Sequence, residues 1–249
     1  MSGHSKWSSI KHKKGKEDAK RGRIFTRLIR ELSTAARIGG PDPEMNPRLR
    51  GAITTAKQSN MPGDNITRAI AKGAGLEEGT TYDEIMFEGY GPAGVAILVE
   101  TMTDNRNRTV ADVRHVLDKY GGKMAETGSV SWMFEKKGVM YADKAAVDED
   151  RITEAALDSG AEDVKDEGDL WMVTTALGDF ETVKAAFDAK GIPYTDAELT
   201  MVPQTYIKLT GREAEKMLRL IDMLEELDDA QHVHANFDIS AEEMEKLSA

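Results

Sequence analysis

Residues 20–37 decide how the chain begins to fold, and they read Lys20-Arg21-Gly22-Arg23-Ile24-Phe25-Thr26-Arg27-Leu28-Ile29-Arg30-Glu31-Leu32-Ser33-Thr34-Ala35-Ala36-Arg37. Its apolar residues recur at helical spacing, at Ile24, Phe25, Leu28, Ile29, Leu32, Ala35 and Ala36. The other face carries cations, at Lys20, Arg23, Arg27, Arg30 and Arg37. Because Gly39-Gly40-Pro41 follows, the helix is expected to end there. The stretch predicts an amphipathic helix with one apolar and one basic face.

Two shorter helices are predicted after it. Asn46-Pro47 is a helix start, and Asp64 is expected to cap a third helix that ends at Gly73. Three short amphipathic helices predict a small bundle over residues 20–75. Residues 1–19 are basic and rich in Ser and Gly, which predicts a flexible arm. A linker is expected at residues 74–82.

Beyond the linker, strand and helix patterns alternate without the long βαβ regularity of a doubly wound fold. Val95–Glu100 is a nearly continuous apolar strand, and a helix is expected between Asn105 and Gly121. Val130–Phe134 and Val139–Tyr141 flank a Gly-containing segment, which predicts a hairpin. The order predicts a three-domain α+β protein whose bundle precedes two small α+β domains, one inserted in the other. Their predicted ranges are 82–134 with 204–249, and 135–203.

Charge is distributed unevenly along the chain. The net charge is −11, but residues up to Lys72 include 16 basic and 6 acidic side chains, and the remainder 17 basic and 38 acidic. A cationic end on an acidic body predicts an anionic partner for that end. The absence of cysteine excludes disulfides and thiol chemistry. No apolar run approaches the ~20 residues that span a bilayer, and no signal peptide is seen, so a cytoplasmic location is expected.

Motifs for catalysis and cofactors are weak. Gly89-x-Gly91-x-x-Gly94 matches the dinucleotide fingerprint in letters, but a strand follows it where that fingerprint opens a helix, so a hairpin turn is favoured. His232 and His234 are expected on one side of a strand, where a surface position is favoured over a metal site. No catalytic constellation is found, and the sequence predicts no enzyme activity, cofactor, metal or small-molecule substrate.

Asp104-Asn105-Arg106-Asn107-Arg108-Thr109 lies where a helix is expected to start. Cations are unfavourable at that end of the helix dipole, so Arg106 and Arg108 suggest a recruited anion. Solvation, or pairing with Glu100 or Asp112, explains them equally well.

The basic arm carries the strongest functional signal. Lysine and arginine interleaved with Trp7 and His12 are typical of phosphate contacts combined with base stacking. A solvated tail with Trp7 packed on the bundle is the alternative. The predicted nucleic-acid-binding residues are Lys6, Trp7, Lys11, His12, Lys13, Lys14, Lys16, Lys20, Arg21, Arg23, Arg27, Arg30, Arg106 and Arg108.

A series of ordered motifs resembles the YebC family over essentially the whole chain. They are Gly3-His4-Ser5-Lys6-Trp7, His12-Lys13, Asp18-Ala19-Lys20-Arg21-Gly22, Asn46-Pro47-Arg48-Leu49-Arg50, Glu88-Gly89-Tyr90-Gly91-Pro92, Asp104-Asn105-Arg106-Asn107-Arg108-Thr109, Gly128-Ser129-Val130, Lys137-Gly138-Val139, Glu154-Ala155-Ala156-Leu157, Gly160-Ala161-Glu162-Asp163 and Arg219-Leu220-Ile221-Asp222-Met223-Leu224-Glu225. The resemblance implies the same three-domain layout and a nonenzymatic role in gene expression. The family includes proteins described as transcriptional regulators and a mitochondrial translational activator of cytochrome oxidase subunit I.

These observations together predict a nonenzymatic nucleic-acid-binding regulator, acting on duplex DNA in transcription. The alternative, also implied by the resemblance, is a ribosome-associated translation factor that binds ribosomal RNA and relieves stalling at sequences such as proline runs. A third hypothesis, an enzyme that uses the Gly-rich turn and a carboxylate pair, is disfavoured because no site with the required geometry is visible. An interaction scaffold whose arm binds another anionic partner is a fourth hypothesis.

Overall fold

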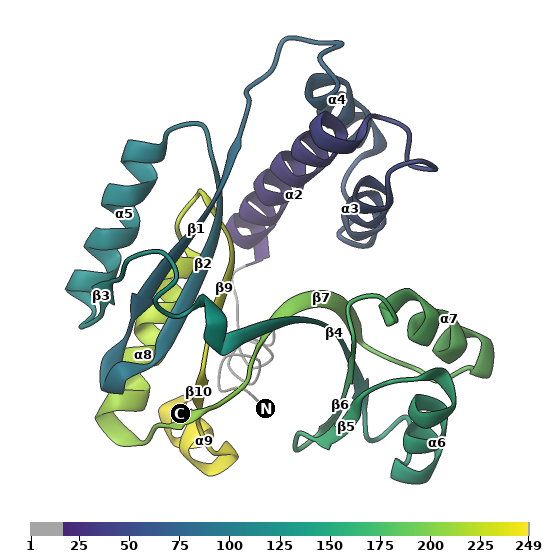
Figure 1. Cartoon of the computed structure of the whole chain (residues 1–249), viewed down its shortest axis with the longest axis vertical. Coiled ribbons are helices and arrows are strands. Elements are labelled where there is room, and N and C mark those ends of the chain that lie inside the picture. The colour runs from purple at the N-terminus through teal and green to yellow at the C-terminus, as the bar shows by residue number, and fades with distance from the viewer. Residues whose placement is uncertain (1–16, 249) are drawn as a thin grey trace.

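The computed structural model describes residues 17–248, which form a helical bundle and two α+β domains (Figure 1). In the bundle, α2 packs against both α3 and α4 through buried side chains that include Leu32, Leu49 and Ala56. The bounds are α2 (Glu17–Gly39), α3 (Pro47–Gln58) and α4 (Gly63–Gly73). The amphipathic helix predicted from the basic stretch is therefore the central helix of the bundle.

Asn46 joins the end of α2 to the start of α3. Its side chain is buried and accepts a hydrogen bond of 3.0 Å from the Leu49 N–H, which caps α3 as predicted. The same amide donates to the carbonyls of Ala35 and Gly40 at 2.8 Å. One side chain thus satisfies orphan backbone groups of two helix ends.

At α4 the structure differs from the predicted cap. The helix begins at Gly63 after Pro62, without a side-chain cap, and Asp64 lies within the first turn. Pro62 presets the backbone and so replaces the expected carboxylate cap. At the other end, a Cβ on Gly73 would lie 2.1 Å from the Ser33 carbonyl oxygen, so glycine permits the close approach of α4 to α2.

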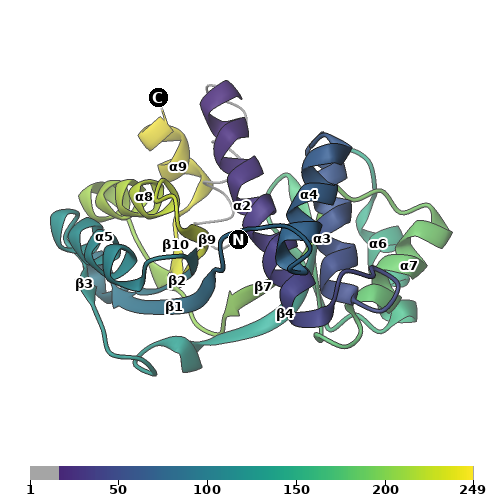
Figure 2. The ribbon, with the colours of Figure 1, turned by 90° about the horizontal axis from the view of Figure 1, so that it is seen from above.

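The second domain is built on an antiparallel sheet with two helices on one face. Val95, Ile97 and Val99 point toward these helices and share one core with them. Figure 2 shows α5 and α8 together on the same side of the strands. The strand order is β3 (Lys123–Met124), β1 (Asp83–Tyr90), β2 (Ala96–Thr103) and β9 (Ala230–Ala235), and the helices are α5 (Arg106–Lys119) and α8 (Gly211–Glu225). The Gly-rich motif forms the β1–β2 turn through η1 (Pro92–Gly94), as its context predicted.

The predicted hairpin near residue 135 is wrong. After η2 (Ser131–Met133), one strand, β4 (Phe134–Asp143), runs without a turn from the second domain into the third. Gly138, which suggested the turn, lies mid-strand, where a Cβ would approach Phe180 to 2.4 Å. The glycine therefore serves close helix–sheet packing and not chain reversal.

The third domain is a second antiparallel sheet covered on one face by two helices. Its core includes Met140, Val173, Ile152 and Phe187. The strand order is β5 (Asp163–Asp166), β6 (Leu170–Thr175), β4 and β7 (Asp196–Pro203), and the helices are α6 (Glu149–Ser159) and α7 (Phe180–Lys190).

The chain then returns to the second domain. Here β9 pairs with β2, although the whole third domain separates them in sequence. The remaining elements are β8 (Ile207–Lys208), β10 (Phe237–Asp238), which pairs parallel with β8, and α9 (Ala241–Ser248). The fold is thus the predicted α+β arrangement with one domain inserted in another.

Candidate nucleic-acid interface

The predicted basic face divides into a described and an undescribed part. Lys6, Trp7, Lys11, His12, Lys13, Lys14 and Lys16 lie outside the described residues. Lys20 and Arg21 belong to the first turns of α2, whose side chains are described from Gly22 onward. Arg23 is half-exposed and its guanidinium lies 3.7 Å from the Glu226 carboxylate. Such an exposed pair is weak and can open to a ligand.

Arg27 and Arg30 attach α2 to the second domain. Arg27 donates to the backbone carbonyl of Glu225 at the end of α8, and burial there lowers the pKa of Arg27 below its ordinary value. Arg30 donates to the carbonyls of Met102 and Asp228, each at 2.8 Å, and its side chain is only 12% exposed. Each guanidinium group thus binds acceptors within the chain, although the Nε of Arg30 is buried without a hydrogen-bond partner.

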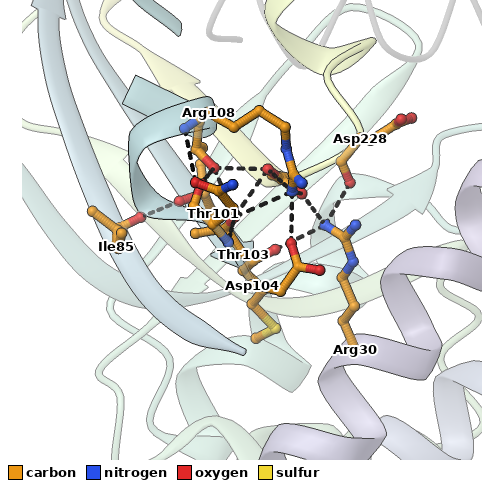
Figure 3. A network of polar contacts seen from close by, with 11 residues as sticks. Arg30, Ile85, Thr101, Thr103, Asp104, Arg108 and Asp228 are labelled. Carbon is orange, nitrogen blue, oxygen red and sulfur yellow. Dashed lines mark hydrogen bonds and ion pairs between the residues drawn. The ribbon is translucent and has the colours of Figure 1, made fainter. Parts of the chain in front are cut away.

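Asp229 is the centre of this attachment. Figure 3 shows Arg30, Arg108 and Thr103, three of its partners, in one network of polar contacts. Its carboxylate is 6% exposed and receives Arg30 at 2.8 Å and Arg108 at 2.9 Å. The hydroxyls of Thr103 and Thr109 lie 3.0 and 2.7 Å from Oδ2. Burial alone would raise the pKa of Asp229, but hydrogen bonds from Thr109, Arg108 and Thr103, with the charge of Arg30, lower it below its usual range.

A β-bulge brings these groups together. The pairing of β2 with β9 shifts register between Glu100 and Thr101, and the Met102 N–H then donates to the Asp229 carbonyl at 2.9 Å. Asn105 caps α5 by accepting from the Arg108 N–H at 3.1 Å. Strand end, bulge and helix start therefore converge on one carboxylate.

The arginines at the start of α5 also have partners within the chain. Arg106 pairs with Asp83 at 2.8 Å on the surface, and Arg108 binds Asp104 as well as Asp229. Hydrogen bonds from Arg108 to Asp229, then to Asp104, raise the pKa of Arg108. The anion inferred at this helix start is thus Asp229, a partner about 120 residues away that the sequence analysis did not pair with it.

Further contacts join the bundle to the second domain. Arg48 binds Glu31 at 2.7 Å and Glu84 at 2.7 Å, so it bridges α2 and β1 from α3. Arg37 donates to the Tyr82 carbonyl at 2.8 Å, and the Arg30 guanidinium lies 5.3 Å from the Tyr82 ring centroid. These contacts fix the direction in which α2 leaves the second domain.

The two histidines noted in the sequence do lie on one face of β9. His234 is buried, contrary to the surface position expected from the sequence, and its Nε2 lies 2.9 Å from Glu100. Both histidines line a cleft of about 350 Å³ between the two sheets. Protein around this cleft lowers the pKa of His232 by desolvation. Within residues 17–248, no group of three His, Cys, Asp or Glu side chains could hold a metal ion. No helix in that range is long and apolar enough to cross a membrane.

Comparison with known proteins identifies the family. The model of the TACO1/YebC N-terminal domain matches residues 5–76, and that of the TACO1/YebC second and third domains matches residues 82–237. The chain belongs to the TACO1/YebC family. Its helical bundle and its pair of nested α+β domains correspond to these two matches.

Relatives share almost the full length of the chain. Proteins of Trichlorobacter lovleyi and Geobacter sulfurreducens are each 58% identical over 247 residues, covering 99% of this chain and 100% of theirs, and both are named probable transcriptional regulatory protein. The crystal structure of a conserved hypothetical protein from Aquifex aeolicus superposes with a TM-score of 0.83 at 46% identity, covering 93% of this chain and 96% of that one.

Proposed function

We propose that this TACO1/YebC member is a nonenzymatic, cytoplasmic regulator of gene expression that binds nucleic acid through its basic N-terminal segment. The observation that carries the proposal is that the basic residues of α2 and of the segment before it fall into two groups. Arg27 and Arg30 bind the second domain, whereas the preceding turns and the arm hold a dense run of cations. A run of cations that is joined through an attached helix to an acidic protein is suited to bind an anionic partner.

We assign the phosphate contacts to the part of the basic segment before the attachment. Arg27, Arg30 and Arg108 are reassigned to positioning, because their guanidinium groups bind the Glu225 carbonyl or the buried Asp229 carboxylate. Arg106 stays a second candidate anchor, because its pair with Asp83 is exposed like that of Arg23 and can open to a ligand. The proposed contact residues are Lys6, Trp7, Lys11, His12, Lys13, Lys14, Lys16, Lys20, Arg21, Arg23 and Arg106.

Duplex DNA is the first candidate target, because the relatives are named as transcriptional regulators. Ribosomal RNA is the second, and one observation favours it. Beyond Lys72 the chain carries 17 basic and 38 acidic residues, so a long duplex lying along the body would be repelled. A ribosome can accept the basic segment in RNA while the acidic domains remain in solvent or face basic ribosomal proteins.

The test compares two variants of equal charge change. One replaces Lys11, Lys13, Lys14 and Lys16 with alanine, and the matched control replaces four exposed lysines of the body, Lys165, Lys190, Lys216 and Lys246. Each is measured against duplex DNA in a salt series and by cosedimentation with ribosomes. The arm variant should bind more weakly, with the salt slope reduced by about 0.9 per lost phosphate contact on duplex DNA. Parental binding by the arm variant would refute the proposal.

The same assay separates the two targets. Salt-sensitive cosedimentation that depends on the arm, and that excess duplex DNA does not displace, identifies a translation factor. Arm-dependent binding to duplex DNA without ribosome association identifies a transcriptional regulator.

A further inference from the structure

Two aromatic side chains are exposed on the second domain, away from the attachment of α2. Trp132 in η2 is 68% exposed and Tyr90 at the end of β1 is 39% exposed. The Trp132 Nε1–H donates to the Ser129 carbonyl at 3.0 Å, and the Tyr90 hydroxyl donates to the same oxygen at 3.3 Å. Their polar ends meet at one carbonyl, and within residues 17–248 neither ring stacks on another.

The loop that carries them is held rigidly. Glu88 is buried and accepts the Gly128 and Val130 N–H groups at 2.6 Å and the Ser131 N–H at 3.0 Å. Val130 is fully buried against β2. Burial would raise the pKa of Glu88, but these three backbone donors hold it below its usual range, so the carboxylate stays charged and bonded. Trp132 is therefore presented on a fixed support.

Cations flank this support. Lys123 is the cross-strand partner of Tyr90, so both side chains lie on one face of the sheet. The Nζ of Lys119 lies 5.4 Å from the centroid of the Tyr120 ring. Residues 119–125 contain no acidic side chain. Acidic residues border the segment at Asp118 and Glu126. The segment between Tyr120 and Trp132 is rich in small residues, with three glycines and two serines among its eleven positions, and it also contains Met124 and Val130.

We propose that Trp132, Tyr90 and Lys123 form a binding site for unpaired nucleobases of a single-stranded nucleic acid. Bases stack on fixed aromatic faces, and a neighbouring lysine contacts the phosphate that follows. The lysine opposite Tyr90 favours this occupant over a protein partner, because lysine is depleted from the core of protein–protein interfaces. The site lies on the second domain and rests on the proposed function, because it names the form of nucleic acid that the regulator binds.

The experiment measures binding of the full chain to a short single-stranded RNA and to the duplex made from it. Trp132→Ala should weaken single-strand binding by about 5- to 150-fold, the range of one lost stacking contact. Duplex binding should not change. Since stacking releases no counterions, the salt slope should stay parental, whereas Lys123→Ala should lower the single-strand slope by about 0.7. Trp132→Phe should retain most of the affinity.

Leu157→Ala, which removes a 73% exposed side chain of α6, is the matched control and should bind as the parent does. The inference is overturned if Trp132→Ala binds single strands with parental affinity, or if it loses single-strand and duplex binding equally, as a fold defect or a general interface would cause. In the first case the arm-lysine variant still reports on the proposed function. A parent that binds neither nucleic acid refutes both.

Discussion

Replacing Asp229 with alanine should weaken the attachment of the helical bundle to the second domain and lower the stability of the protein. The substitution removes the acceptor of four donor side chains, Arg30, Arg108, Thr103 and Thr109, in a site where the carboxylate is 6% exposed. Removing one partner of a buried ion pair leaves the other charge uncompensated and costs about 3–5 kcal/mol. We expect a loss of that size in unfolding free energy, measured by urea denaturation followed by far-UV circular dichroism.

Asp104→Ala is the matched control, because Asp104 also binds Arg108 but is 44% exposed. Its loss should stay below about 1 kcal/mol, as for surface pairs. In a double-mutant cycle, Arg30→Met combined with Asp229→Ala should cost less than the sum of the single changes, with a coupling of about 0.5–3 kcal/mol. If Asp229→Ala destabilises no more than Asp104→Ala, or if the cycle shows no coupling, the attachment is not held by this carboxylate.

Three further outcomes are expected. Folding lowers the pKa values of Asp229 and Glu88, so the stabilisation from these carboxylates is present above their unfolded pKa and is lost as the pH falls through their folded pKa. The free energy of unfolding, measured across pH, should therefore fall below about pH 4. The fall should be less steep in Asp229→Asn, which lacks one of the two carboxylates. Glu88→Gln should cost about 1–3 kcal/mol, since one N–H loses its acceptor, and should speed hydrogen exchange at the Gly128 and Val130 amides; unchanged exchange would contradict the support role. Gly73→Ala should destabilise by about 1–3 kcal/mol through its contact with Ser33, whereas Gly51→Ala in open space on α3 should stabilise by about 0.5–1 kcal/mol, both read from thermal unfolding.

Local patterns in the sequence predicted the elements whose signals are local. The apolar spacing in α2, the Asn46 cap and the Gly-rich turn before β2 each involve residues a few positions apart, and the structure confirms them. The hairpin prediction failed at Gly138, where glycine is needed because Phe180 packs closely against the strand. In sequence, such a glycine cannot be distinguished from one that reverses the chain. Its role depends on a helix that begins some 40 residues later.

The candidate site shows the same limit. The sequence analysis named Arg30 and Arg108 as site residues but did not identify Asp229 as the carboxylate that binds them. Asp229 lies about 200 residues from Arg30 and about 120 residues from Arg108 along the chain. Asp228 and Asp229 follow an apolar helix and precede a strand, and this pattern does not distinguish a surface turn from a buried centre. The exposure of Trp132 was not predicted for a similar reason, since it follows from the loop held by Glu88.

The nested topology has a consequence for the order of events during synthesis. Strand β9 and Asp229 leave the ribosome only after the whole third domain, so β2 has an open edge until then. The third domain is a continuous stretch and can fold while that edge waits, whereas an unpaired apolar edge is a hazard for aggregation. Arg30 and Arg108, made early, acquire their shared carboxylate last. The orientation of the helical bundle is therefore set only when nearly the entire chain has been made.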